Sequence, residues 1–347
     1  MKNALIACTV GCFLRFELND ISILQDMGYT VHVATNFNGY DEMHVKIKEM
    51  NVVIHQVDFA RSPFSKQTIN AYRQLKRIMR EKHFDLIHCH TPVGGVLTRL
   101  SANKYHKKGL KILYTAHGFH FFKGAPLKNW LLYYPVEWIC SWMTDVLITI
   151  NQEDYKRAKE KFHAKRVEYI SGVGIDLSKF NSNVINVDKK RNELGVKPDE
   201  ILLLSVGELN QNKNHELVIR AIYALDNPKI RYFIAGNGDL KDYLENLIHD
   251  LGLESQVRLL GYRNDVAELY QVSDLFVFPS KREGLSVALM EAIASKVPVM
   301  CSDIRGNKDL IKEYLFDSKS VDSLYMMLKE TVNTREEMHQ LMNATVL

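Results

Sequence analysis

The sequence predicts an α/β protein made of two Rossmann-like, doubly wound domains that face a cleft. Short apolar runs alternate with segments of helical spacing over residues 2–170, and the same alternation resumes at Ile201. Between these stretches, residues 171–180 (SGVGIDLSKF) hold two glycines and no clear periodicity, so we expect a hinge there. The predicted domains are therefore residues 1–172 and 173–347.

The composition is that of a globular protein long enough for two full cores. Of the 347 residues, 46% are hydrophobic and 25% are charged. The five cysteines show no C-x-x-C spacing, which indicates reduced thiols. The N-terminus runs straight into a strand without a signal-peptide pattern, and no window reaches the roughly 18 uninterrupted apolar residues that a membrane span needs. We expect a cytoplasmic protein without a transmembrane helix.

Charge is distributed unevenly along the chain. Counting Lys and Arg against Asp and Glu gives +9 for residues 1–172 and −5 for residues 173–347, which together make the formal charge of +4. A basic half beside an acidic half indicates that the basic half meets an anionic partner. Because no nucleic-acid-binding module is visible, we expect anionic lipid or a lipid diphosphate at the inner membrane surface, and no nucleic acid.

In the first domain, runs rich in Val, Ile and Leu predict strands, and apolar residues at helical spacing predict helices. The expected strands are 2–10, 30–35, 52–57, 85–90, 111–116, 145–150 and 166–170. The expected helices are 14–27, 41–50, 67–82, one that ends near 104, and 151–161. This alternation favours a parallel sheet covered on both faces, and we interpret the basic run of helix 67–82 as a solvated face.

Two features of this domain lie where its strands end. Gly11 follows the first strand, where ligands of doubly wound sheets gather, although a simple tight turn also explains it. The G-x-G-x-x-G string of a dinucleotide site is absent, which argues against a Rossmann oxidoreductase. His88 and His90 share one face of a strand but have no third ligand at useful spacing, so we favour a structural role over metal binding.

The stretch 119–143 (FHFFKGAPLKNWLLYYPVEWICSWM) contains all three tryptophans, with Lys123 and Lys128 near its start. Aromatic residues interleaved with lysines are typical of a segment that lies at a membrane surface. A buried core helix explains the same pattern, and the sequence leaves both interpretations open.

In the second domain the same patterns predict strands at 201–206, 230–235, 257–260, 274–278 and 297–301. They predict helices at 189–195, 216–225, 240–251 and 285–295. Residues 302–306 are expected to form a loop, and the pattern weakens from Asn307 onward.

The stretch 274–295 combines a buried strand, a polar turn and a helix expected to start at Leu285. Such a helix N-terminus holds an anion with backbone N–H groups and the helix dipole. Glu283 lies just before this helix and Glu291 is expected two turns inside it, about 12 Å away at 1.5 Å per residue. Since an acid repels phosphate, we interpret both as acceptors for sugar hydroxyls. The alternative is a solvated turn residue and a helix surface charge.

Three further turns follow strands of this domain. Lys213 stands at a helix start in the loop GELNQNKNH, where its charge adds to the helix dipole on a diphosphate, unless it is a solvated surface lysine. The turn 236–239 contains a G-x-G string. Tyr262 and Arg263 follow the strand 257–260, and Arg263 either faces a nucleotide base or pairs with Asp265.

These strings resemble glycosyltransferase family 4. The run from Phe278 to Ala292 is similar to the E-x7-E signature of its retaining enzymes, and the run from Val206 to Asn214 is similar to its V-G-x-L-x-x-x-K motif. The resemblance covers residues 1 to about 325 and points to the bacterial exopolysaccharide and capsule branch. It implies a GT-B fold and transfer of a hexose or N-acetylhexosamine from a UDP-sugar to a lipid-linked or glycan acceptor. It implies neither a metal nor a cofactor.

The resemblance also implies roles for single residues. Lys213 would stabilise charge on the leaving diphosphate, Glu283 would hold sugar hydroxyls near the anomeric carbon, and His117 would orient the sugar. The remaining residues implied in donor binding are Gly11, Glu208, Asn214, Tyr262, Arg263, Gly284, Leu285, Ser286 and Glu291.

Two departures from the family pattern keep other functions open. Glu208 stands where the family usually has a phosphate-binding Arg, so Arg15 or Arg282 would have to supply that charge. The final helix that the family carries is not recognisable in residues 334–347, so we expect a truncated or divergent end. The alternatives are a non-catalytic subunit that binds a nucleotide sugar and a GT-B-fold UDP-sugar 2-epimerase.

Overall fold

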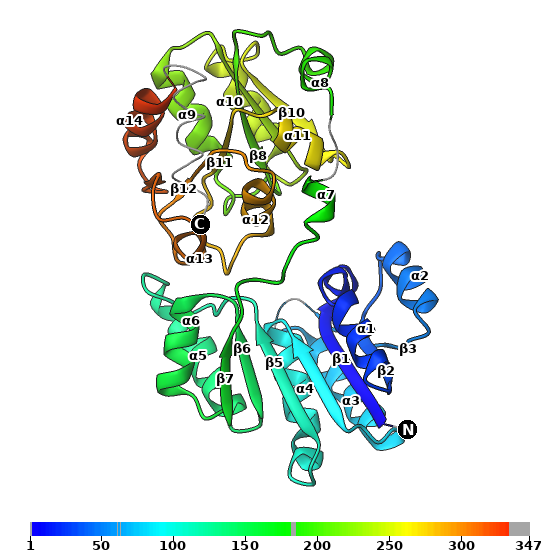
Figure 1. Cartoon of the computed structure of the whole chain (residues 1–347). Helices are drawn as coiled ribbons and strands as arrows, with labels where there is room; N and C mark the ends of the chain where they lie inside the picture. The colour runs from blue at the N-terminus through cyan, green and yellow to red at the C-terminus, as the bar shows by residue number, and fades with distance from the viewer. Residues whose placement is uncertain (1, 61, 63, 182–184, 333–347) are drawn as a thin grey trace. The chain divides into compact units, whose positions relative to one another are not determined.

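The computed structural model describes residues 2–60, 62, 64–181 and 185–332. The chain divides into two compact units, Met1–Val173 and Gly174–Leu347. Each unit contains one parallel sheet flanked by helices (Figure 1). The predicted fold class, α/β with two doubly wound sheets, is confirmed. Residues 334–347, for which a truncated or divergent end was expected, lie outside the described residues.

The first unit is built on a seven-stranded parallel sheet with the order β3-β2-β1-β4-β5-β6-β7. Its strands are β1 (Lys2–Val10), β2 (Tyr29–Asn36), β3 (Val53–Gln56), β4 (Leu86–His90), β5 (Lys111–Ala116), β6 (Val146–Thr149) and β7 (Arg166–Tyr169). The order reverses between β1 and β4, where Ala7 pairs with Cys89. Ligands of open parallel sheets bind outside the carboxyl ends of the strands at this reversal.

Helices cover both faces of this sheet. One face carries the 3-10 helix η1 (Gly11–Phe16), α1 (Leu18–Asp26) and α2 (Asp41–Glu49). The other carries α3 (Lys66–Glu81), α4 (Pro92–His106), α5 (Leu127–Ser141) and α6 (Gln152–Lys161). The expectation of one helix over 14–27 is wrong, because Glu17 (φ −106°, ψ 4°) separates η1 from α1. Its N–H bonds to the Leu14 carbonyl in a 3-10 turn, and its side chain is only 3% exposed.

A buried ion pair fixes α5 to its neighbour α4. Arg99 Nη2 lies 2.7 Å from Glu137 Oε2, the Tyr114 hydroxyl donates to Glu137 Oε1 at 3.1 Å, and the guanidinium lies 3.8 Å from the Tyr114 ring centre. The pair anchors the inner face of α5. Its outer face is apolar yet exposed, as shown by Leu127 at 72% and Leu131 at 69%. The start of the stretch 119–143 is buried at Phe119 and Phe121, whereas much of α5 is exposed, and contact of this segment with a membrane stays a prediction.

The second unit is built on a six-stranded parallel sheet with the order β10-β9-β8-β11-β12-β13. Its strands are β8 (Ile201–Val206), β9 (Ile230–Ala235), β10 (Val257–Gly261), β11 (Leu275–Phe278), β12 (Val299–Ser302) and β13 (Leu315–Phe316). Its helices are α7 (Ser178–Asn181), α8 (Val187–Leu194), α9 (His215–Leu225), α10 (Lys241–Asp250), α11 (Val266–Val272), α12 (Val287–Ala294), α13 (Arg305–Leu310) and α14 (Val321–Thr331).

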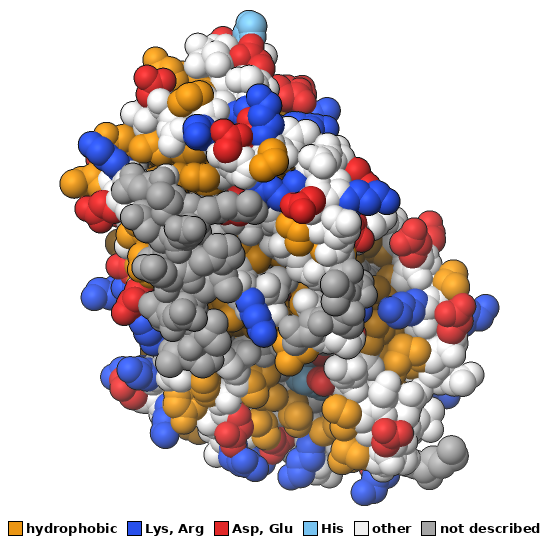
Figure 2. Space-filling model, turned by 45° about the horizontal axis from the view of Figure 1, so that its top comes forward, with side chains coloured by type: hydrophobic (Ala, Val, Ile, Leu, Met, Phe, Trp, Pro, Cys, Tyr) orange, Lys and Arg blue, Asp and Glu red, His pale blue; other side chains and the backbone are white. Residues whose placement is uncertain are grey.

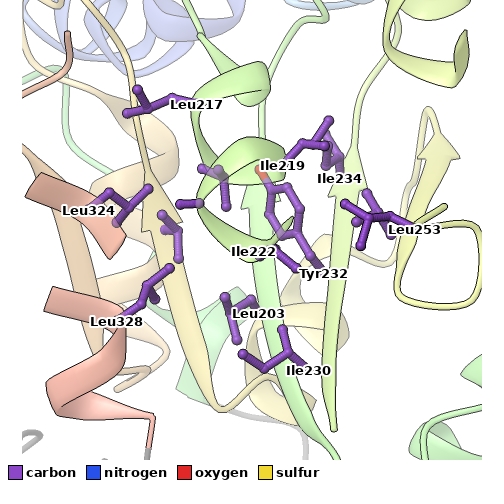
Figure 3. Close-up of a cluster of buried hydrophobic side chains, with 14 of the residues drawn as sticks. Leu203, Leu217, Ile219, Ile222, Ile230, Tyr232, Ile234, Leu253, Leu324 and Leu328 are labelled. Carbon is purple, nitrogen blue, oxygen red and sulfur yellow. The ribbon is translucent and has the colours of Figure 1, made fainter. Parts of the chain in front are cut away.

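Five of these elements were not predicted: α7, which begins within the expected hinge, α11, α13, β13 and α14. The expected loop over 302–306 is wrong, because α13 begins at Arg305. These elements are short and depend on packing more than on periodicity. In α14, Ser320 caps the helix by accepting from the Ser323 N–H at 3.1 Å. Leu324 and Leu328 then point from α14 into the core beside α9 and the sheet (Figure 3).

No helix in the described part of the chain is both long and apolar enough to cross a membrane. On the face shown in Figure 2, Lys and Arg side chains are interspersed with Asp and Glu, so neither sign forms a continuous field there.

Candidate functional site

The loop between β8 and α9 places Lys213 at the carboxyl end of the second sheet. The Lys213 N–H is held by Asn210 Oδ1 at 2.9 Å. A Cβ on Gly207 would lie 3.2 Å from Lys213 Cδ, so this glycine gives the lysine stem room to pass. Burial, with the charge of Lys213 adding to it, lowers the pKa of His215 to about 4. His215 is thus neutral beside Lys213.

Lys213 and Glu283 are in direct contact, although 70 residues separate them. Lys213 Nζ lies 2.8 Å from Glu283 Oε1, and both side chains are largely buried, at 20% and 15% exposed. The ammonium also lies 4.9 Å from the Phe278 ring centre. Since β8 and β11 are neighbouring strands, their following turns meet at one edge of the sheet. The structure therefore brings together the two residues expected to hold diphosphate and sugar.

The turn after β11 leads into α12 through an N-cap. Ser286 Oγ accepts from the Leu289 N–H, and the helix begins at Val287. The expected start at Leu285 and the position of Glu291 two turns inside the helix are therefore wrong, because Glu291 is the fifth helical residue, just over one turn in. Its Oε2 accepts a hydrogen bond from the Tyr270 hydroxyl at 3.3 Å. Tyr270 thus fixes the direction of this carboxylate.

The turn after β9 packs against the Lys213 loop through two glycines. A Cβ on Gly236, whose φ is +153°, would lie 1.9 Å from the Gly207 carbonyl oxygen, and one on Gly238 would lie 2.4 Å from that of Leu209. Backbone bonds join the same segments, from the Leu209 N–H to the Asn237 carbonyl and from the Leu240 N–H to the Leu209 carbonyl. The G-x-G string therefore supports the lysine loop.

Gly236→Ala is expected to lower the free energy of unfolding of the second unit by about 3 kcal/mol or more, because strain at positive φ adds to the clash. Gly252→Ala is the matched control. Gly252 also has positive φ, +67°, but its Cβ would meet no heavy atom within 4 Å, so we expect about 1 kcal/mol. Hydrogen exchange of the β8 amides measures both changes. Equal losses for the two variants would contradict the packing argument.

Asn214 ties the lysine loop to the rest of the site. It is the N-cap of α9 in the left-handed conformation, with φ 59°. Its side chain is buried and donates to the carbonyl oxygens of Pro279 and Ser318, at 3.2 and 3.0 Å. Its observed function is to hold the end of β11 beside α9, and donor contact by Asn214 stays a prediction.

Three other residues expected to bind the donor differ in exposure and in their polar partners. Tyr262 is 74% exposed. Arg263 forms a two-pronged ion pair with Asp265, at 2.8 and 2.5 Å, the pairing that the sequence left open. Glu208 is exposed and accepts from Asn210 Nδ2 at 3.0 Å.

Arg305 is a cation at this site that the sequence did not point to. It opens α13, and its Nε donates to the Glu283 backbone carbonyl at 3.2 Å. A Cβ on the adjacent Gly306 would lie 2.3 Å from the Gly284 carbonyl oxygen, so α13 packs directly on this turn. No periodic signal predicted α13, and hence none placed Arg305 beside Glu283.

In the first unit, His117 lies at the end of β5 beside a buried polar cluster. Its Nε2 is 3.3 Å from Nδ1 of His90, and His90 Nε2 is 3.1 Å from Glu17 Oε2. His88 Nδ1 lies 3.2 Å from Asp20 Oδ2. Burial, with a smaller effect of His88, lowers the pKa of His117 to about 4, so the ring is neutral.

Two trios within the described residues have ligand atoms close enough for a metal ion: Glu17, His90 and His117, and Glu17, Asp20 and His88. Neither trio contains His88 and His90 together, so the structure does not make these two histidines a joint metal site. Glu17 belongs to both trios and is brought to them by the fold, not by sequence spacing. Within the first trio, the His90–His117 contact is the one with hydrogen-bond geometry.

Gly11 has a packing explanation. A Cβ there would lie 3.1 Å from Phe37 Cδ1 and 3.2 Å from Tyr40 Cβ, so the turn after β1 fits closely against the loop after β2. This contact accounts for a small residue at position 11, and ligand approach there stays a prediction.

Each half of the chain matches a glycosyltransferase family model. Residues 22–179 match the model described as "Glycosyltransferase Family 4", and residues 186–345 match "Glycosyl transferases group 1".

The chain is also similar to curated glycosyltransferases along much of its length. It is 40% identical over 317 residues to "Putative glycosyltransferase EpsD" of Bacillus subtilis (strain 168), which is 90% of this chain and 81% of that protein. It is 30% identical to "UDP-Gal:alpha-D-GlcNAc-diphosphoundecaprenol alpha-1,3-galactosyltransferase" of Escherichia coli, over 72% of this chain and 66% of that one.

Solved structures share the fold at low identity. HepE of Anabaena, in complex with UDP and glucose, aligns with a TM-score of 0.78 at 17% identity, covering 99% of this chain and 93% of that one. WaaG, a glycosyltransferase involved in lipopolysaccharide biosynthesis, aligns with a TM-score of 0.75 at 17% identity, covering 99% and 94%. This likeness concerns the fold, and it agrees with the two Rossmann-like units described above.

Proposed function

Because this chain belongs to glycosyltransferase family 4, we propose that it is a retaining enzyme that moves a hexose or N-acetylhexosamine from a UDP-sugar. The acceptor is a lipid-linked or other glycan in the synthesis of a cell-surface polysaccharide. The E. coli relative supports this choice, since its name contains both UDP-Gal and a diphosphoundecaprenol acceptor. HepE supports the choice of nucleotide, because it was solved with UDP-glucose.

The contact between Lys213 and Glu283 carries the proposal. In the donor complex, the ammonium moves to the diphosphate and Glu283 accepts bonds from sugar hydroxyls. The bond between the anomeric carbon and the diphosphate oxygen breaks, the acceptor hydroxyl oxygen takes its place, and the hydroxyl proton leaves with UDP. Lys213 stabilises the charge that develops on the diphosphate, and such electrostatic stabilisation is usually the largest contribution to catalysis.

Other residues complete the proposed site. Glu291, directed by Tyr270, binds the ribose, and His117 orients the sugar through one of its hydroxyls. Arg305 supplies the positive charge that Glu208 lacks, because it already lies against the Glu283 turn. With two cations and a helix N-terminus for the diphosphate, the proposed reaction needs no metal.

A panel of UDP-sugars tests this function directly. We expect one sugar to raise the melting temperature, since ligand at a hundred times its Kd stabilises by about 2.7 kcal/mol. We expect UDP release from that sugar only when a lipid-linked acceptor is present. Binding without turnover favours the non-catalytic subunit. Conversion of the free donor to an isomer without acceptor favours the 2-epimerase.

We further propose that the first unit docks on the inner face of an anionic membrane. A groove of about 830 Å³ between α3 and α4 is lined by six cationic side chains and by no acidic one. The six are Arg73, Lys76, Arg80, Lys104, Lys107 and Lys108. Since α4 also packs against α5, this groove and the exposed apolar face of α5 lie on the same side of the sheet. A basic groove beside an apolar helix suits a surface of anionic lipid.

The double variant Leu127→Glu, Leu131→Glu is expected to bind vesicles that contain phosphatidylglycerol at least about 10-fold more weakly than the wild type. Both side chains are exposed, so the fold should be unaffected. The control is Ile23→Glu, Met27→Glu, because these exposed residues belong to the segment that covers the other face. Co-sedimentation at low and high salt measures binding. Equal weakening by both double variants, or binding insensitive to salt, would contradict this docking face.

A further inference from the structure

The buried polar cluster next to His117, formed by Glu17, Asp20, His88 and His90, has one feature that the proposed function does not use. Glu17, His90 and His117 form a line of close contacts at the carboxyl ends of β1, β4 and β5, and these three strands are adjacent in the sheet. Glu17 is 3% exposed and His90 is 1% exposed. Two buried polar groups therefore lie directly behind the residue proposed to contact the sugar.

Glu17 and Asp20 share one proton. Burial, then the charge of Asp20 and a hydrogen bond with it, raise the pKa of Glu17 to about 9. A hydrogen bond from His88 is the main cause that lowers the pKa of Asp20. Asp20 is therefore the anion and Glu17 the neutral acid, and the Glu17 O–H donates to Asp20. His88 is fixed as well, because its other nitrogen lies 2.8 Å from the Thr115 hydroxyl.

The Glu17 oxygen that carries no proton can only accept a hydrogen bond. His90 Nε2 lies 3.1 Å from Glu17 Oε2, outside good hydrogen-bond alignment, and it finds no better acceptor among the described residues. Burial holds the pKa of His90 well below its usual value, so this ring carries one proton. With that proton on Nε2 facing Glu17, Nδ1 of His90 has a lone pair. That lone pair accepts from His117 Nε2, at 3.3 Å.

We propose that Glu17 is a positioning residue which, through His90, holds His117 in the tautomer with its proton on Nε2, so that Nδ1 presents an acceptor to a hydroxyl of the donor sugar. The half-buried His117 ring is turned by the same line of contacts and by the edge of Phe13, whose ring centre is 4.7 Å away. A fixed tautomer matters because the other tautomer would present an N–H donor at Nδ1 instead of an acceptor. The inference rests on the proposed function only for the identity of that hydroxyl.

Two variants at position 17 separate this role from packing. Glu17→Gln keeps a donor for Asp20 and an acceptor for His90, so it mimics the neutral acid. We expect its kcat at pH 7.5 to stay within about 3-fold of wild type, whereas Glu17→Ala should lose about 10–100-fold, the usual effect of removing a group that orients a histidine. Equal loss in the two variants, or no loss in either, would overturn the proposal.

The ring nitrogens of His117 give a readout that needs no turnover. In ¹⁵N-labelled protein, wild type and Glu17→Gln should show a protonated Nε2 and an unprotonated Nδ1, and Glu17→Ala should show a mixture. A wild-type His117 protonated on Nδ1 would overturn the inference. If no UDP-sugar is turned over, the proposed function fails while this spectrum still decides the tautomer.

The trio Glu17, His90 and His117 also has ligand atoms close enough for a metal ion, and this alternative can be tested separately. A chelator that abolishes activity and shifts the His117 signals would mark the cluster as a metal site and overturn the relay.

Discussion

Lys213→Ala is expected to lower kcat for sugar transfer by about 10²–10³-fold, the loss typical of one group that stabilises transition-state charge. The ammonium lies 2.8 Å from Glu283 in the free protein, so its removal has two effects. The diphosphate loses its cation as it leaves, and Glu283 stays as an unpaired carboxylate that repels the donor. We therefore expect KM for the UDP-sugar to rise as well.

Lys281 is the matched control for this prediction. It lies in the turn that faces the lysine loop, where its N–H donates to the Asn212 carbonyl, but its side chain is exposed. Lys281→Ala should stay within about 3-fold of wild type. Lys213→Arg restores the charge with a planar, bulkier group, and we expect partial recovery. A Lys213→Ala variant that keeps wild-type kcat would contradict the proposed role and the function built on it.

The strands were the most predictable part of the fold. The limits of Lys111–Ala116, Ile201–Val206 and Ile230–Ala235 agree with those read from the sequence, because strands covered on both faces are mostly apolar along their length. Short elements such as α11 and β13 have too few residues to display a period. Their conformation depends on neighbours distant in sequence, as Tyr270 of α11 does on Ala288 and Glu291.

The residues of the candidate site also fall into those that the sequence predicted and those that it did not. Lys213 and Glu283 could be paired from sequence because each belongs to a string of recognisable type and spacing, and the structure joins them. Arg305 and Glu17 could not. The significance of each comes from what the fold packs against it, a carbonyl in one case and two histidines in the other. A lone arginine or glutamate carries no pattern that reports such surroundings.

Glu137→Ala is expected to lower the free energy of unfolding of the first unit by about 3–5 kcal/mol, because it leaves the Arg99 guanidinium buried without its counter-charge. Arg99 is 1% exposed, and Glu137 Oε2 lies 2.7 Å from it. The Tyr114 hydroxyl also loses its acceptor. Since this cluster joins α5 to α4, the variant should also weaken the docking face on α5.

The three tryptophans make this prediction measurable. Trp130 and Trp138 lie in α5 and Trp142 directly follows it, so tryptophan fluorescence during urea unfolding reports the first unit alone. The control is the double variant Arg99→Met, Glu137→Leu, which replaces the pair by apolar groups of similar volume and should recover most of the loss. A loss below about 1 kcal/mol for Glu137→Ala would mean that water solvates Arg99 in the folded unit. The ion pair would then not be what holds α5 in place, and the apolar face would need another anchor.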